Sequence, residues 1–366
     1  MNIAEATFRT AARFELKRLD ELTPEQRKPF EELAQDADFY GLLIPRTASA
    51  ATVKSVWKDV ADLLRALASP SRLNGTALDG DEIIDLVLDG VLEVDDGGEF
   101  IAGADALPLV CRAAAPKDGL STDALRYAED LEESDPDTLS RALYLYNRIP
   151  MSAFWKARFA NREAILAHLG ARPDASWEVL PPEQSNGWIV FHARDRRAYR
   201  RGDAVFKLYV SPRPESIRDA FDAVVRVLSG RGIDFKIGHD AAGLLRPDKL
   251  VAYFSTREEL DDVAQALRAR LAGCPAHGVP FTAALDDASL LSWGLDPPDS
   301  ARALSWLGRE SWRLWLATKL GTAMAFAKSE SVRRSAAPSA FAVERIRRLG
   351  VDVDRWTPSQ SLWSEA

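Results

Sequence analysis

The stretch that most constrains the fold is residues 206–238, which read FKLYVSPRPESIRDAFDAVVRVLSGRGIDFKIG. Its two ends are β-like runs, and the segment between them has the apolar spacing of a helix. Pro214 suits the first turn of that helix, and Gly230 suits its end. A strand, a helix and a second strand in so short a space predict a mixed α+β unit.

Both predicted strands carry a lysine. Side chains two residues apart on a strand share a face, so Lys207 and Tyr209 point one way and the apolar residues beside them point into the core. In the second strand, Phe235 and Ile237 share the buried face, which leaves Lys236 on the opposite one. If the two strands are neighbours, they present Lys207, Tyr209 and Lys236 toward one surface.

The rest of the C-terminal half continues the alternation. Residues 249–255, KLVAYFS, predict a further strand, and the next helix opens with a Thr-x-x-Glu capping box from Thr256 to Glu259. Two apolar-rich helices are expected over 301–329 and 338–350. We therefore expect residues 176–366 to form an α+β domain with a mostly antiparallel sheet.

Residues 1–175 are expected to form a separate helical domain, with the boundary in the Pro-, Ser- and Asn-rich linker at 171–187. The first 70 residues have helical spacing, and residues 121–170 predict further helices. Residues 91–102 contain the Asp-Asp-Gly-Gly turn of a β-hairpin. Two interpretations of that hairpin stay open. It caps a helical domain, or it is the wing of a winged-helix-like unit, a module that binds a leader peptide by strand addition.

Cysteine, histidine and charge narrow the function classes. The 366 residues include only Cys111 and Cys274 and four scattered histidines, so neither a disulfide framework nor a metal site is indicated. Residues 1–150 hold 16 basic and 29 acidic side chains, a net charge of −13, which argues against a nucleic-acid partner. The remaining 31 basic and 26 acidic side chains give a net of +5. With no signal peptide and no apolar run of about 18 residues, we expect a cytoplasmic protein without a membrane partner, metal or cofactor.

Four of the cations between residues 207 and 249, with one phenol, lie on a predicted strand or at the entrance to one: Lys207, Tyr209, Lys236, Arg246 and Lys249. Such a group fits recognition of a phosphate dianion. A lysine among other cations has its pKa lowered from about 10.4, which a general base near neutrality requires. A simpler interpretation stays open, because lysines on edge strands commonly serve to block aggregation.

The pattern KLY-VS at 207–211, a helix, and then Phe235-Lys236 resembles the lyase fold of the phosphothreonine lyases. It also resembles the lyase domain of class III lanthipeptide synthetases, where the segment carries Lys-x-His and a later Phe-Lys. The tyrosine variant, the helix SWLGRESWRLWLATKLGTAMAFA and the ending FAVERIRRLGVDVDRWTPSQSLW are similar to the HopA-like family. That family includes a type III effector family and stand-alone proteins of ribosomally made peptide pathways. The resemblance covers residues 185–360 and leaves the N-terminal half outside.

The resemblance implies β-elimination of phosphate from phosphoserine or phosphothreonine of a precursor peptide, which leaves a dehydroamino acid, as in lanthipeptide or thioamitide maturation. It also implies a kinase-like protein partner and no cofactor. Lys236 would be the base, while Lys207, Arg246 and Lys249 would hold the phosphate. Arg313, or its neighbour Arg309, would supply a further guanidinium.

One position departs from the pattern. The phosphothreonine lyases have a histidine that protonates the leaving oxygen, and this chain has Tyr209 there. A phenol can donate a proton if nearby cations lower its pKa toward neutrality; His239 is an alternative donor. If the acid is missing, the chain is a non-catalytic component of a peptide-modifying complex that binds phosphopeptide, leader or kinase. A further alternative is a type III effector that acts on host signalling.

Trp306, Trp312 and Trp315 are expected to pack in the core.

Overall fold

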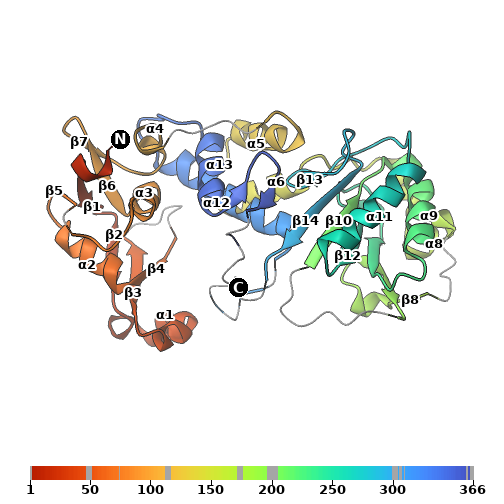
Figure 1. Ribbon diagram of the computed structural model, residues 1–366, viewed down its shortest axis with the longest axis horizontal. Coiled ribbons are helices and arrows are strands. Elements are labelled where there is room, and N and C mark those ends of the chain that lie inside the picture. The colour runs from red at the N-terminus through yellow and green to blue at the C-terminus, as the bar shows by residue number, and fades with distance from the viewer. Residues whose placement is uncertain are drawn as a thin grey trace.

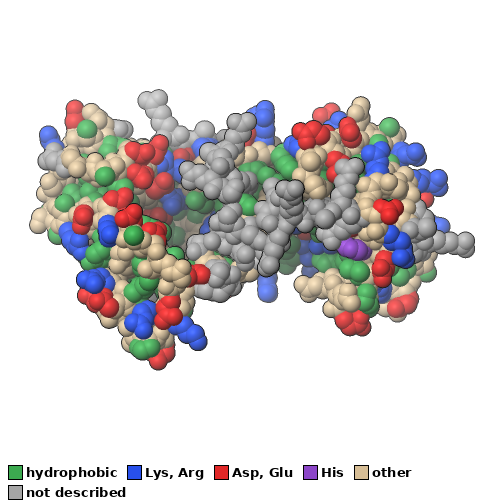
Figure 2. All heavy atoms as spheres, turned by 60° about the horizontal axis from the view of Figure 1, so that its bottom comes forward, with side chains coloured by type: hydrophobic (Ala, Val, Ile, Leu, Met, Phe, Trp, Pro, Cys, Tyr) green, Lys and Arg blue, Asp and Glu red, His purple; other side chains and the backbone are tan. Residues whose placement is uncertain are grey.

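The computed structural model describes residues 2–46, 52–73, 75–111, 117–170, 176–195, 205–298, 304, 307–308, 310–359 and 362. The chain is drawn out along one axis as three bodies (Figure 1). An N-terminal body lies at one end, a bundle of helices lies at the centre, and a body built on a large sheet lies at the other end. On the face shown in Figure 2, acidic and basic side chains are interspersed over both end bodies.

The N-terminal body contains two small antiparallel sheets, in the strand orders β5-β1-β6-β7 and β2-β3-β4. Its core is apolar and includes Phe8, Leu64, Ile83 and Val94. The elements are β1 (Thr7–Thr10), β2 (Phe14–Lys17), α1 (Pro24–Arg27), β3 (Phe39–Pro45), β4 (Lys54–Trp57), α2 (Lys58–Ala66), β5 (Ser71–Arg72), α3 (Gly80–Leu88), β6 (Leu92–Asp96), β7 (Glu99–Ile101) and α4 (Leu107–Val110).

The expectation of helices throughout the first 70 residues is wrong, because strands β1 to β4 lie there. Phe8 of β1 is fully buried and lies opposite Val94 of β6, so pairing with a distant segment stabilises a strand where local spacing favours a helix. The helix expected over 52–70 begins only at Lys58, because the residues before it form β4. The hairpin expected at 91–102 is confirmed as β6 and β7.

The central bundle combines helices from both halves of the sequence. α5 (Leu120–Asp130) and α6 (Pro136–Leu145) pack with α12 (Trp312–Glu330) and α13 (Pro338–Arg348), and a short hairpin of β15 (Val351–Asp352) and β16 (Thr357–Pro358) follows. Leu139, Leu143, Leu316 and Leu320 are fully buried in their shared core. This core crosses the boundary expected near residue 175. The linker expected at 171–187 is also wrong in part, because it contains β8 (Trp177–Val179), whose Trp177 is buried in the core of the sheet body.

The sheet body has one antiparallel sheet in the order β13-β14-β10-β12-β11-β9-β8. α8, α9 and α11 cover one face of it, and their apolar side chains share a core with Leu208 and Phe235. The elements are α7 (Ala153–Arg158), α8 (Arg162–Leu169), β8 (Trp177–Val179), β9 (Trp188–Ala193), β10 (Val205–Val210), α9 (Ile217–Leu228), β11 (Phe235–Gly238), α10 (Ala241–Leu244), β12 (Leu250–Phe254), α11 (Arg257–Arg270), β13 (Ala283–Ala284) and β14 (Leu291–Asp296).

The α+β class and the antiparallel sheet are confirmed. The predicted alternation in the second strand is also present, since Phe235 and Ile237 are fully buried and Lys236 is not. The Thr256 hydroxyl accepts a hydrogen bond from the backbone N–H of Glu259, as the capping box predicts. No helix in the described ranges is both long and apolar enough to cross a membrane.

Candidate functional site

The two strand lysines lie on the same face of the sheet but not on neighbouring strands. β12 runs between β10 and β11, and its register places Tyr253 opposite Lys207. The Tyr253 ring lies between the two amines, with its centroid 5.4 Å from Lys207 Nζ and 5.5 Å from Lys236 Nζ. This is the sheet face that the helices of the core leave uncovered, and the central bundle lies over part of it.

Lys207 is paired with a carboxylate of the adjacent strand β14. Its Nζ lies 2.5 Å from Asp296 Oδ2, and both side chains are largely buried. Asp296 also accepts a hydrogen bond of 2.9 Å from the backbone N–H of Trp312, the first residue of α12. The Lys207–Asp296 pair therefore joins the sheet to the start of α12.

Lys236 lies against aromatic rings. Its Nζ lies 4.1 Å from the centroid of the Trp188 ring on β9, which shields the amine from water. Burial, followed by the charge of Lys207, lowers the pKa of Lys236 to about 8, although Asp248 and Asp296 act in the opposite direction. About a tenth of this amine is therefore unprotonated at pH 7, far more than for an ordinary lysine.

Arg246, Asp248 and Arg313 form a second ion-pair group on the same face. Arg246 makes two hydrogen bonds to the Asp248 carboxylate, of 2.8 and 2.7 Å. Arg313 Nη1 lies 2.7 Å from Asp248 Oδ2, close enough for an ion pair but without hydrogen-bond geometry. Burial alone would raise the pKa of Asp248, but Arg313 and Arg246 hold it well below the usual range.

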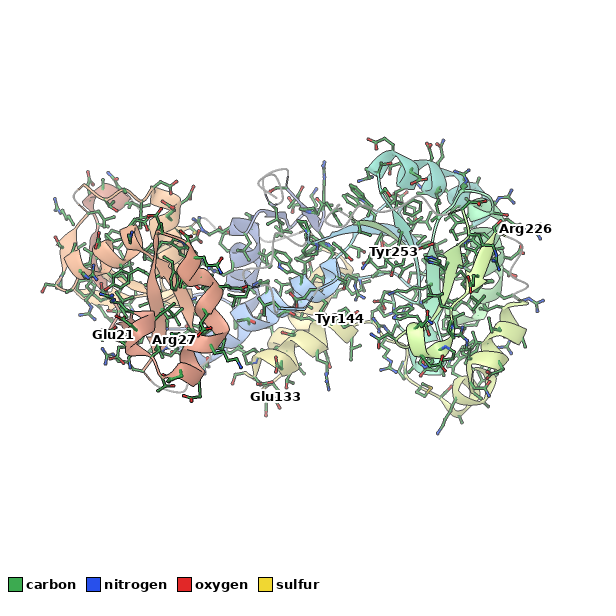
Figure 3. All side chains as sticks on the ribbon, turned by 90° about the horizontal axis from the view of Figure 1, so that it is seen from below. Glu21, Arg27, Glu133, Tyr144, Arg226 and Tyr253 are labelled. Atoms are coloured by element: carbon green, nitrogen blue, oxygen red, sulfur yellow. The ribbon has the colours of Figure 1, made fainter. Side chains whose placement is uncertain are left out.

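Tyr144, at the end of α6, closes the site from the side of the central bundle. Its hydroxyl accepts a hydrogen bond of 2.7 Å from Arg246, and its backbone carbonyl accepts one of 3.0 Å from Arg313. Figure 3 labels Tyr144 on the bundle and Tyr253 on the sheet, one on each side of the site. Both arginines also lie over the Tyr144 ring.

We refer to these residues together as the cation cluster. It contains four basic side chains and two carboxylates, with three aromatic rings among them: Lys207, Lys236, Arg246, Arg313, Asp248, Asp296, Tyr144, Trp188 and Tyr253. With all six groups charged, its net charge is +2. Such an excess suits a dianion that presents several acceptor oxygens, such as a phosphate monoester.

Tyr209 lies on the expected face but is buried. Its ring packs with Val251 and Val279, and 3% of its surface is exposed. Burial, followed by the charge of Asp296, raises its pKa well above 10. The expectation that nearby cations lower this pKa toward neutrality is therefore wrong, because the loss of water outweighs the attraction of Arg313.

Lys249 has no exposed surface and is paired with a histidine. Its Nζ lies 2.7 Å from His277 Nδ1, and His277 Nε2 lies 2.5 Å from the backbone oxygen of Asn147. Burial lowers the pKa of Lys249 to about 7, and burial together with Lys249 lowers that of His277 to about 4. The structure thus places Lys249 in a buried pair with a neutral partner, where a phosphate group would have to displace His277 to reach it.

Two of the remaining predicted residues, Arg309 and Trp306, lie outside the described residues. His239 follows β11, and its Nδ1 lies 3.8 Å from Asp240. Trp312 is fully buried in the bundle core and Trp315 packs against that core, as expected.

Sequence reasoning missed five members of the cation cluster: Asp248, Asp296, Tyr144, Trp188 and Tyr253. Tyr253 alternates with buried residues in KLVAYFS, so the strand pattern could have placed it on the same face as the lysines. Asp248 could have been suspected as the acid between two cations in RPDK. Tyr144 comes from the other half of the chain, and nothing local indicates its position.

In the part of the chain that the structure describes, no group of three or more His, Cys, Asp or Glu side chains could hold a metal ion. No protein-family model and no curated protein sequence matches the chain. Two solved structures are similar to it at low identity. The effector protein from Pseudomonas syringae pv. tomato strain DC3000 has 12% identity and a TM-score of 0.40, covering 66% of this chain and 96% of its own. The effector protein from Pseudomonas syringae pv. syringae strain 61 has 11% identity and a TM-score of 0.39, covering 66% and 97%. At these values the likeness assigns neither a fold nor an activity to this chain.

Proposed function

We propose that the chain is a carbon–oxygen lyase that removes phosphate from phosphoserine or phosphothreonine in a peptide and leaves a dehydroamino acid. The observation that carries this proposal is the cation cluster. Lys236, with its pKa of about 8, lies among three further cations and two carboxylates. An amine that is partly neutral beside a dianion site is the combination that this elimination needs.

The reaction begins with the neutral amine of Lys236. It takes the α-proton of the phosphorylated residue, and the electron pair of that C–H bond becomes the Cα=Cβ double bond as the Cβ–O bond breaks. The departing phosphate carries the released electrons, and Lys207, Arg246 and Arg313 stabilise its growing charge. Lys236 ends the step as an ammonium.

The leaving phosphate needs one proton to depart as a dianion. Tyr209 is poorly suited to donate it, because its pKa is raised well above 10. In this proposal Lys207 donates it, because its ammonium lies on the same sheet face as Lys236, and the negative charge that develops on the departing oxygen draws the proton away from the Asp296 pair. One proton is then gained at Lys236 and one is lost at Lys207, so the charge of the cluster is unchanged.

A phosphorylated substrate must be supplied by phosphoryl transfer. We therefore include in the proposal a kinase-like partner that phosphorylates Ser or Thr of a ribosomally made precursor peptide. The dehydroamino acid produced would be an acceptor for later ring closure, as in lanthipeptide or thioamitide maturation.

The test is mass spectrometry of a phosphothreonine peptide after incubation with the wild-type chain, with Lys236→Met, and with Lys156→Met as a control at an exposed lysine. We expect loss of phosphoric acid with the wild type and the control, and none with Lys236→Met. If none of the three eliminates phosphate although all bind the peptide, the lyase assignment is wrong. The second candidate function is then a non-catalytic phosphopeptide-binding component. The burial of Tyr209 favours it, because a buried phenol is a poor proton donor.

A further inference from the structure

A groove runs between the N-terminal body and the central bundle, away from the cation cluster. Its volume is about 380 Å³, and residues of β4, α3, α12 and α13 line it. Leu349 is exposed along it, and the buried side chains of Phe326 and Phe341 back it. Clefts between separately folded bodies, apolar with a few placed polar groups, are common ligand sites.

An edge strand borders the groove. β4 pairs with β3, and in the described ranges no strand pairs with its other edge. Figure 1 shows β4 on the side of the N-terminal body that faces α12 and α13. An unpaired edge offers backbone N–H and C=O groups to an extended peptide, which can add to the sheet as a further strand.

Two exposed apolar side chains flank β4, and one lines the groove. Val53, just before β4, is 44% exposed; Trp57, at its end, is 39% exposed and packs on Phe39. Leu349, 40% exposed, lines the groove and offers a partner an apolar contact.

The charge of the groove lining indicates what kind of partner fits. Three cations, Lys54, Lys319 and Arg345, face one carboxylate, Asp89. Asp89 is occupied, because Lys54 and Arg345 lie 3.2 and 2.8 Å from its Oδ1. Arg345 is also paired with Asp85, 2.8 Å from its Nη1. Lys319 is exposed and leaves the lining with positive charge toward solvent.

α12 connects this groove to the cation cluster. Arg313 belongs to the cluster and Phe326 lines the groove, and they are 13 residues apart on the helix. At 1.5 Å per residue this is about 20 Å. An extended peptide spans that distance in about six residues, so one chain could occupy both places.

We propose that this groove binds an extended peptide segment with acidic and aliphatic side chains, which adds as a strand to the free edge of β4. The segment would belong to the same peptide whose phosphorylated residue reacts at the cation cluster. The inference rests on the proposed function only in that choice of ligand, since the groove and the cluster share no residue.

The first experiment selects ligands from a displayed library of random peptides with the full chain as bait, in the absence of phosphate groups. We expect enriched peptides to combine Asp or Glu with Leu, Ile or Val, and to bind at least tenfold more weakly to the double variant Lys319→Glu, Leu349→Asp. Both residues are exposed, so the fold should persist. The matched control, Phe154→Asp with Lys156→Glu, changes the same residue classes on α7 and should bind as the wild type does.

A second measurement separates strand addition from simple contact. N-methylation of alternate residues in a selected peptide removes the N–H groups that a strand needs, and it should abolish binding. Hydrogen exchange of the β4 amides should slow when the unmethylated peptide is bound. Peptides that are basic, that tolerate N-methylation, or that bind the double variant normally would overturn the proposal.

The absence of any enriched peptide would also overturn the proposal. So would a wild-type dimer that dissociates in the double variant, because the groove would then hold a second copy of the chain. These outcomes are independent of the elimination assay. If the chain removes phosphate but selects no groove peptide, the lyase assignment holds and this inference is wrong. If it selects a groove peptide but removes no phosphate, this inference holds and the lyase assignment is wrong.

Discussion

The cation cluster and Lys249 lie next to each other, because Asp248 of the cluster directly precedes Lys249 in the sequence. The positive charges in the two places are compensated in different ways. In the cation cluster, Asp248 and Asp296 offset the charges of Arg246, Arg313 and Lys207. Lys249, the residue after Asp248, has His277 as its hydrogen-bond partner instead. A carboxylate keeps a buried cation charged, whereas a neutral partner lets burial lower its pKa, here to about 7.

Lys236 lies between these two cases. It shares a sheet face with the ion pairs, yet its Nζ faces aromatic rings. Its pKa of about 8 reflects that intermediate position. In the proposed mechanism, the carboxylates would keep Lys207, Arg246 and Arg313 charged for phosphate binding and leave the Lys236 amine available as the base. The predictions below test each part of it.

The largest effect is expected when the shared carboxylate is removed. Asp248→Ala leaves Arg313, 1% exposed, without its acidic partner. Breaking a buried ion pair from one side typically costs about 3–5 kcal/mol, because the remaining charge stays buried and uncompensated. Urea unfolding should show a loss of that size. Asp261→Ala, which breaks the more exposed pair with Arg257, should cost less than about 1 kcal/mol. Equal losses in the two variants would mean that Asp248 has no special role.

The second prediction concerns the pH dependence of stability at Lys249. Its folded pKa of about 7 lies below the usual 10.5, so between these values the unfolded chain binds a proton that the folded chain does not. Wild-type stability therefore gains from this residue as pH rises through that window, and the gain is absent at pH values below 7.

Lys249→Met removes this contribution. Between pH 7.5 and 9.5 the wild type should gain roughly 2 kcal/mol of unfolding free energy relative to the variant. Lys156→Met, at an exposed lysine, should follow the wild type at both pH values. If the difference between wild type and Lys249→Met does not change with pH, Lys249 is charged in the folded state and the contrast with the cation cluster fails.

The third prediction concerns the coupling between the two strand lysines. The charge of Lys207 contributes to the lowered pKa of Lys236, and Asp296 acts against it. Lys207→Met removes the cation and frees the carboxylate, so both changes raise the pKa of Lys236 above about 8. The pH titration of the 13C-labelled Lys236 side chain by NMR would measure the shift directly. Elimination by this variant should also fall, because Lys207 is the proton donor and a phosphate ligand in the proposed mechanism; an unchanged or lower pKa of Lys236 would contradict the coupling.

The same comparison explains how much of the site the sequence could predict. Strand alternation placed Lys207, Tyr209 and Lys236 on one face, because period-two patterning is local. It could not place β12 between the two lysines, because strand order depends on pairing along the whole chain. Nor could it place Tyr144, which reaches the site through the packing of α6 against α12.

Burial was the other quantity that local pattern could not supply. Tyr209 was assigned to the face of the lysines and Lys249 to the entrance of the next strand, but the loop that carries His277 and Val279 covers both side chains. In the N-terminal body, short runs such as Thr7–Thr10 carry too few residues to separate a strand from a helix by periodicity, and pairing with β6 decides the outcome. The winged-helix-like interpretation of the hairpin at 91–102 stays a prediction.

The smallest effect is expected at Tyr209, and it bears most directly on the mechanism. Tyr209→Phe removes only a hydroxyl whose pKa is raised well above 10, so elimination by the variant should stay within about threefold of the wild type. A true general acid contributes about 100-fold or more, so its loss would be unmistakable. The matched control is Tyr127→Phe, which removes the same group from an exposed tyrosine of α5, outside the cation cluster and the groove. A loss of 100-fold in Tyr209→Phe alone would restore the phenol as proton donor, and Lys207 would then act only as a phosphate ligand.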